Sequence, residues 1–103
     1  MSPRWEESAF VFGDLQTAAQ FIHRDNPTAA YAFLEAAYDT FEFLARNPGV
    51  GRQRLDLGYP EIHSWRISGF RRYLIFYRTF PDRIQIWRVL HGARDLHQTL
   101  GGQ

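Results

Sequence analysis

Four side chains in the second half of the chain are of types that can act on a phosphate ester, namely Arg66, Arg88, His91 and Arg94. Histidine exchanges a proton near neutral pH and can serve as a general acid or base, and arginine can stabilise negative charge that develops on phosphate. A structural role is the simpler interpretation of His91, which we expect to hydrogen bond to the backbone at the end of a strand. Arg94 and the adjacent Asp95 are expected to form a local ion pair that contributes under about 1 kcal/mol if exposed.

These residues belong to, or follow, the strands of a predicted hairpin. Two apolar runs, 73–77 and 84–90, flank residues 79–83, where Pro81 and Asp82 favour a turn. Both faces of the first run are apolar, so we expect this strand to be covered on both sides, at least in part. The second run is expected to alternate regularly, with one face shared by Ile84, Ile86, Arg88 and Leu90. We therefore place this hairpin at the centre of the sheet.

A further strand is predicted directly before the hairpin. Residues 61–67 alternate between apolar and polar side chains and are expected to pair with the first run across a turn at Ser68–Gly69. Residues 49–59 are predicted to form a loop. Its glycines do not form a phosphate-binding loop, because the Gly-Lys-Ser/Thr sequence that such a loop requires is absent.

The first half of the chain predicts a short edge strand at residues 3–7 and two helices. Ser8 is expected to cap a first helix that ends near Asp25, and Asn26–Pro27 is expected to start a second helix that ends at residues 47–49. The predicted core face of the first helix consists of Val11, Leu15, Ala18, Ala19 and Ile22. That of the second consists of Ala30, Leu34, Ala37, Tyr38, Phe41, Leu44 and Ala45.

Phe43 is the exception on the second helix. It points nearly opposite Leu34, among charged side chains, and could contact a partner. A single exposed Phe is ordinary on a protein surface, and we favour that interpretation.

The predicted order is strand, helix, helix, strand, strand, strand. This order describes a single α+β domain over residues 1–103, in which a helical hairpin covers one face of an antiparallel sheet. Residues 98–103 are expected to fray at the end of the chain.

Composition excludes several kinds of protein. A chain of 103 residues that is 45% hydrophobic can bury roughly two thirds of its unfolded surface. The absence of cysteine excludes disulfides and a thiolate nucleophile, and the four histidines lack metal-site spacing, so we expect neither a metal nor a cofactor. With neither a membrane span nor a signal peptide in the sequence, we expect the protein to stay in the cytoplasm.

Charge is divided unevenly along the chain. Residues 1–49 hold three Arg and seven acids, giving −4, whereas residues 50–103 hold nine Arg and four acids, giving +5. Every basic residue is Arg, which suits bidentate contacts to carboxylate or phosphate, although a genome that favours Arg codons is the simpler explanation for the missing Lys. A basic sheet half fits an acidic protein partner as well as a nucleic acid.

Two sequence segments resemble a known family. The strand Tyr-Leu-Ile-Phe-Tyr-Arg at 73–78, followed by Ile-x-Ile-x-Arg-Val-Leu-His-Gly-Ala-Arg-Asp-Leu at 84–96, is similar to the C-terminal signature of the ParE branch of RelE/ParE toxins. Ser8, Asp14–Leu15, Phe21–Ile22 and Asn26–Pro27 resemble the start of the same family at matching spacing. The resemblance therefore covers nearly the whole chain.

The resemblance implies the toxin of a type II toxin–antitoxin system. Such a ParE-like toxin is not an enzyme. It inhibits bacterial growth by binding DNA gyrase, and a cognate ParD-like antitoxin neutralises it in a hetero-oligomer. Contact with operator DNA is implied only indirectly, through the antitoxin. The residues that we expect to contact the antitoxin or the target are Arg66, Arg72, Arg78, Arg88, His91 and Arg94.

The alternative function is that of a RelE-like ribonuclease that cleaves mRNA on the ribosome. His91, Arg88, Arg94 and Arg66 would then supply the acid, the base and the cations for phosphodiester cleavage. Ribonucleases of the family commonly carry a Tyr or a His-Tyr pair near the C-terminus and several lysines. Here the last Tyr is Tyr77 and there is no Lys, so we favour the binding toxin. A regulatory domain that binds an antitoxin without being toxic is a third possibility.

Overall fold

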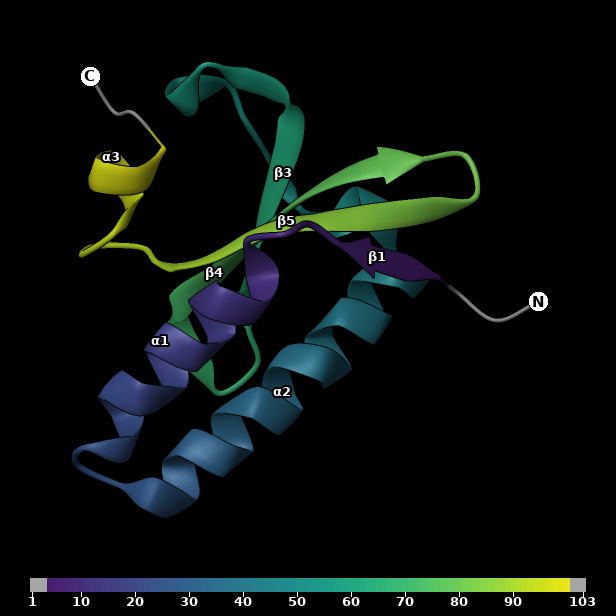
Figure 1. Cartoon of the computed structure of the whole chain (residues 1–103). Helices are drawn as coiled ribbons and strands as arrows, with labels where there is room; N and C mark the ends of the chain where they lie inside the picture. Colours follow the sequence, from purple (N-terminus) through teal and green to yellow (C-terminus); the bar gives the residue numbers. More distant parts are fainter. Residues whose placement is uncertain (1–3, 101–103) are drawn as a thin grey trace.

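The computed structural model describes residues 4–100. It consists of a five-stranded sheet with a helical hairpin packed on one face (Figure 1). The elements in chain order are β1 (Trp5–Glu7), α1 (Val11–His23), α2 (Pro27–Arg46), the 3-10 turn η1 (Pro48–Val50), β2 (Arg52–Arg54), the 3-10 turn η2 (Leu55–Leu57), β3 (Tyr59–Ile67), β4 (Phe70–Phe80), β5 (Arg83–His91) and α3 (Leu96–Thr99). Within the described part of the chain, no helix is long and apolar enough to cross a membrane.

The strand order in the sheet is β1-β5-β4-β3-β2. Strands β2 to β5 are antiparallel neighbours, but β1 pairs with β5 in parallel, so the sheet is mixed rather than antiparallel throughout. Strand β2 also lies in the segment for which we expected only a loop. The expected α+β fold and order of elements are confirmed, with strand β2 and the short helix α3 added, and β3 and β4 join through the expected turn at Ser68–Gly69.

Helix α1 starts three residues later than Ser8, which does not cap it. The Ser8 hydroxyl instead donates to the carbonyl oxygen of Trp87 at 2.6 Å and accepts the N–H of Phe10 at 3.2 Å, so it ties the entry of the helix to β5. Helix α2 begins as expected, because the Asn26 side chain accepts the N–H of Ala29 at 3.1 Å.

The core face of α2 differs in part from the prediction. Phe33 and Thr40 are buried, whereas Tyr38 is exposed, because α2 lies beside α1 and contacts α1 on one side and the sheet on another. Thr40 is tolerated in the core because its hydroxyl donates to the carbonyl oxygen of Ala36 at 2.7 Å.

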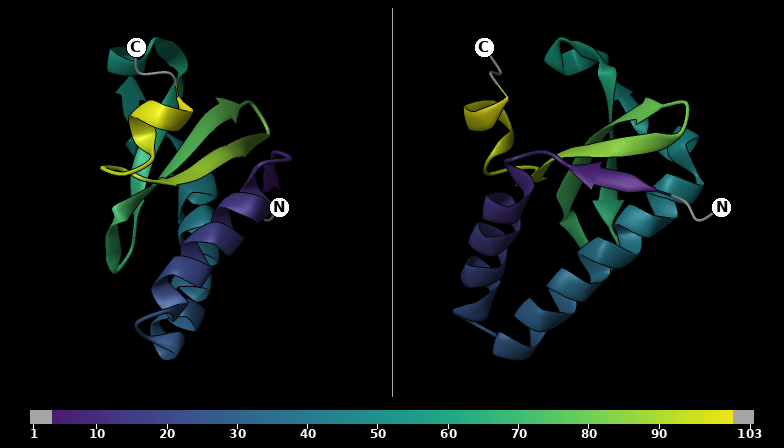
Figure 2. Two further views of the ribbon diagram at one scale, coloured as in Figure 1. Left: turned by 60° about the vertical axis from the view of Figure 1, so that its left-hand side comes forward. Right: turned by 45° about the vertical axis from the view of Figure 1, so that its right-hand side comes forward.

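Two hydrophobic clusters lie on opposite faces of the sheet, which confirms that β4 is covered on both sides. The larger one holds Tyr73, Ile75 and Tyr77 of β4 against α1 and α2, and the smaller one holds Leu74 and Phe76. Helix α3 and the η2 segment lie over the smaller cluster, on the side of the sheet away from the helical hairpin (Figures 1 and 2).

A β-bulge in the pairing of β4 with β5 overturns the regular alternation that we expected for β5. Tyr77 is opposite Ile86 and Phe76 is opposite Arg88, so Trp87 is an extra residue. Because one added residue reverses the alternation, Val89 joins Ile86 in the larger cluster, whereas Leu90 packs in the smaller one.

Residues 98–100, part of the tail that we expected to fray, have a defined place in the structure. Gln98 and Thr99 belong to α3, and Leu100 is only 3% exposed because it packs into the smaller cluster. Residues 101–103 lie outside the described residues.

Candidate functional site

A buried ion pair joins α1 to β5 at the centre of the predicted site. Arg88 donates from Nε and Nη2 to the two carboxylate oxygens of Asp14, both at 2.8 Å, and the same carboxylate accepts the N–H of Val89 at 3.0 Å. The side chains of Arg88 and Asp14 are only 16% and 10% exposed, and the hydrogen bonds that Arg88 donates to Asp14 raise the pKa of Arg88. Arg88 is therefore committed to the fold rather than open to a phosphate or a partner carboxylate.

His91 occupies the turn that follows β5. Its Nδ1 accepts the backbone N–H of Arg94 at 3.0 Å, and this is the backbone hydrogen bond that we expected of it. Burial and the positive charges of Arg94 and Arg72 lower the pKa of His91. The lowered pKa favours the neutral form of the ring, in which Nδ1 can act as an acceptor.

Asp95 closes the same turn. Its carboxylate accepts the N–H of His91 at 3.1 Å and forms the expected ion pair with Arg94, whose Nε donates at 3.0 Å. Burial alone would raise the pKa of Asp95, but these bonds lower it. Arg94 also lies over the ring of Phe21 on α1, 4.5 Å from its centroid, so its guanidinium is held on two sides.

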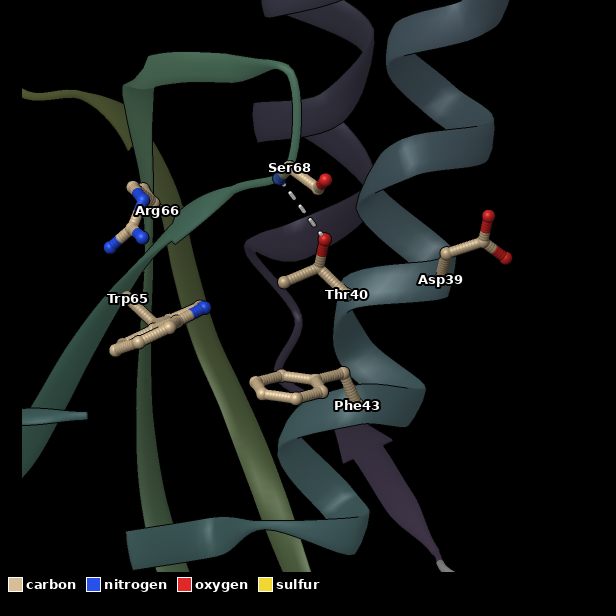
Figure 3. Close-up of a pocket in the computed structure, with 6 residues that line it drawn as sticks. All are labelled: Asp39, Thr40, Phe43, Trp65, Arg66 and Ser68. Carbon is tan, nitrogen blue, oxygen red and sulfur yellow. Dashed lines mark hydrogen bonds between the residues drawn. The ribbon is translucent and has the colours of Figure 1, made fainter. Parts of the chain in front are cut away.

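The predicted catalytic residues open onto three different hollows. Arg88 and Arg94 line one hollow, of about 200 Å³, beside Tyr73. His91, which is hydrogen-bonded to Arg94, lines another with the arginines Arg71 and Arg72. Arg66 lies on β3 in a third hollow (Figure 3), so the four predicted catalytic residues do not surround one position.

Four arginines of β3 and β4 form no ion pair with another residue in the range 4–100, namely Arg66, Arg71, Arg72 and Arg78. Arg72 and Arg78 alternate with residues of the larger cluster and so lie on the face away from α1 and α2. We call these two residues the basic sheet face. The guanidinium of Arg66 instead lies over the Trp65 ring, beside α2. Arg78 is partly buried, and its Nε has no hydrogen-bond partner among residues 4–100.

An apolar groove on the outer side of the helical hairpin was not predicted. Two adjoining hollows of about 330 and 300 Å³ share Ala19, Gln20 and Leu34. The large side chains at this surface are Phe12 and Tyr31, which are 73% and 71% exposed, and Tyr38. We call this surface the outer groove. Phe12 and Tyr31, as large apolar residues outside both predicted core faces, were the signal in the sequence that could have revealed it.

Two further residues that organise the fold escaped the sequence analysis. Asp14 was not linked to Arg88, because the two lie 74 positions apart. Arg54 is a buried arginine whose guanidinium donates to Asp56 at 2.7 Å and to the Ser64 hydroxyl at 3.1 Å. These bonds lower the pKa of Asp56 to about 2.

Comparisons with known proteins point to one family. Residues 5–96 match the family model described as "ParE toxin of type II toxin-antitoxin system, parDE". Among solved structures, the chain is similar to one titled "Chromosomal ParDE TA system from P. aeruginosa", with a TM-score of 0.72. The identity is 18%, and the match covers 88% of this chain and 95% of that chain, so this likeness concerns the fold. A comparison with curated proteins found no match.

The Asp14–Arg88 pair generates a prediction about stability. Asp14→Ala leaves a guanidinium and the Val89 N–H without their acceptor in a partly buried place, so the free energy of unfolding should fall by about 3 kcal/mol. Urea unfolding measures this change. Asp39→Ala is the matched control on an exposed side chain and should change stability by under about 0.5 kcal/mol. A coupling energy below about 0.5 kcal/mol in a double-mutant cycle with Arg88→Ala would contradict the assignment.

The environment of His91 generates a prediction about pH. Because the pKa of His91 is lowered from its ordinary value of 6.5, the unfolded chain binds the proton more readily than the folded chain. Stability from the neutral ring is therefore present above pH 6.5 and is lost as the pH falls below it. In urea unfolding at about pH 7.5 and about pH 5.5, His91→Gln should lose less stability on acidification than the wild type. Equal losses would show that His91 has no such role, and His97→Gln is the exposed control.

Proposed function

The chain belongs to the ParE toxin family of type II toxin–antitoxin systems, and from this premise we propose that it inhibits DNA gyrase by binding rather than by catalysis. A ParD-like antitoxin neutralises it by forming a hetero-oligomer with it. The toxin acts in the cytoplasm, and it reaches operator DNA only through the antitoxin.

The observation that carries this proposal is that groups that a nuclease would need are already hydrogen-bonded within the fold. Arg88 has its carboxylate partner inside the fold, and His91 uses Nδ1 to accept a backbone N–H. A ribonuclease requires a proton shuttle and unpaired cations at one phosphate. The arginines that share a hollow with His91 are Arg71 and Arg72, and the predicted catalytic arginines Arg66, Arg88 and Arg94 open onto other hollows. The residues that stay available are surface groups, which suit recognition of a partner.

Two surfaces support neutralisation by an antitoxin. The outer groove presents apolar side chains between two helices, which is the surface that an amphipathic helix buries when a disordered tail folds on binding. The basic sheet face offers Arg72 and Arg78 to acidic residues of the same tail. Arg66, Arg88, His91 and Arg94 complete the set of residues expected from the sequence to contact either the antitoxin or the target. Of these, Arg88 is the one that its pair with Asp14 makes least available.

The target is tested with purified gyrase and relaxed plasmid. We expect the wild type to inhibit supercoiling and His91→Gln to inhibit it about as well, because Gln retains an acceptor for the Arg94 N–H. A catalytic proton shuttle would instead be worth about 10² to 10⁴ in rate. The same protein should leave ribosome-bound mRNA intact. Codon-specific cleavage that disappears in a folded His91→Gln variant would establish the ribonuclease function in place of the binding toxin.

The antitoxin surface is tested by calorimetric titration with the co-encoded antitoxin. Phe12→Ala and Tyr31→Ala each remove apolar area from the outer groove and should weaken binding about tenfold or more. Phe80→Ala, a partly exposed Phe on β4 away from the groove, should bind like the wild type.

Salt provides the second arm of this test. Added salt should weaken antitoxin binding, because salt screens the attraction between exposed charges. The weakening should be smaller in a variant carrying Arg72→Glu and Arg78→Glu, which lacks two of the attracting positive charges. If antitoxin affinity changes neither with salt nor with these charge reversals, the basic sheet face is not part of the antitoxin-binding surface.

A further inference from the structure

Phe43, the exception on the predicted second helix, lines a preformed pocket between α2 and β3 (Figure 3). The pocket has a volume of about 390 Å³ and is lined by Asp39, Thr40, Phe43, Trp65, Arg66 and Ser68. Phe43 remains 41% exposed, and its ring stacks with that of Trp65 at a centroid distance of 6.0 Å and an angle of 30°. The two rings form an apolar wall that is open to solvent.

Polar donors border this aromatic wall. The guanidinium of Arg66 lies over the Trp65 ring, 4.7 Å from its centroid, and has no acidic partner within the described chain. In Figure 3 the indole nitrogen of Trp65 lies on the side that faces α2. A stacked guanidinium keeps its N–H edge free and oriented, so it can bind a carboxylate at a low cost in side-chain entropy.

Thr40 holds the pocket together. Its hydroxyl donates to Ala36 within α2 and accepts the N–H of Ser68 at 3.4 Å, which links the helix to the β3–β4 turn. Figure 3 shows this link on the upper side of the pocket, above Trp65 and Phe43. The pocket is therefore present before any partner binds.

The pocket and the outer groove lie on different sides of α2. At 100° per residue, Phe43 is about 180° and Asp39 about 140° from Leu34, which lines the outer groove. A single helix bound in the outer groove therefore leaves the pocket uncovered. The two surfaces suit two different chain segments.

We propose that this pocket is a second docking site, which binds an extended segment of the toxin's target protein. The segment carries a large apolar side chain, which packs on Phe43 and Trp65, next to a carboxylate, which pairs with Arg66. Trp and Arg are the residue types that most often dominate binding energy at protein interfaces. The proposal rests on the proposed function in one respect, namely that the toxin acts by binding a protein.

Charge favours a protein segment over a nucleic acid at this pocket. Asp39 lines its α2 side, and Glu35 is exposed on the same helix. Glu42 is also exposed there but is paired with Arg46. The carboxylates of Asp39 and Glu35 repel a phosphate backbone, whereas a segment with a single carboxylate can place it beside Arg66 alone.

The test compares Phe43→Ala and Arg66→Glu with two matched controls. Phe80→Ala removes another partly exposed Phe, and Arg71→Glu reverses another exposed arginine that has no ion pair in the described chain. Each protein is scored for growth inhibition at equal soluble expression, for binding to immobilised gyrase and for affinity to the co-encoded antitoxin. We expect the two pocket variants to bind gyrase at least tenfold more weakly and to relieve growth inhibition. Their antitoxin affinity should stay within twofold of the wild type.

Three results would overturn the pocket proposal. The first is full growth inhibition by both pocket variants. The second is a loss of antitoxin affinity with unchanged target binding, which would make the antitoxin the occupant. The third is a loss of RNA binding in the pocket variants alone, which would make the partner a nucleic acid. If the wild type inhibits growth without binding gyrase, the gyrase assignment fails, and the growth comparison between pocket variants and controls still decides the pocket.

Discussion

The ion pair between Asp14 and Arg88 is the interaction on which the arrangement of the two layers depends. It joins α1 to β5 across 74 positions of sequence, and its carboxylate also takes the N–H of Val89 beside the β-bulge. Because β5 lies between β1 and β4, this contact sets the position of the helical hairpin on the sheet. A partly buried charge pair has this effect because either partner alone would be costly to bury.

The same pair also bears on function, because the bonds from Arg88 to Asp14 make Arg88 less available to a phosphate or a partner. In the turn after β5, His91 accepts a backbone N–H and Arg94 pairs with Asp95. The surfaces that we propose for recognition lie mostly elsewhere, on the outer groove, the basic sheet face and the Phe43 pocket. These surfaces are held by a packed core but are not part of it, so they can contact partners without cost to the fold.

The sequence by itself determined the elements and much of the chemistry. Periodicity placed both helices, the β4–β5 hairpin and the two covered faces of β4, because the burial of one segment depends mainly on its own side chains. Turn residues located Ser68–Gly69 and the start of α2 for the same local reason. The motif of residues 73–96 indicated the family, and the position of His91 after a strand indicated its backbone hydrogen bond.

Only the tertiary structure decided which segments meet. Three features depend on the identity and register of a partner strand, which the alternation of side chains in one segment does not specify. They are the parallel pairing of β1 with β5, the added strand β2, and the bulge that moves Leu90 to the other face. The arginines show the same limit of sequence analysis. Arg88 and Arg66 look alike in the sequence, but Arg88 forms a largely buried ion pair, whereas Arg66 keeps an available guanidinium. The difference arises because an acid from a distant element reaches one of them and not the other.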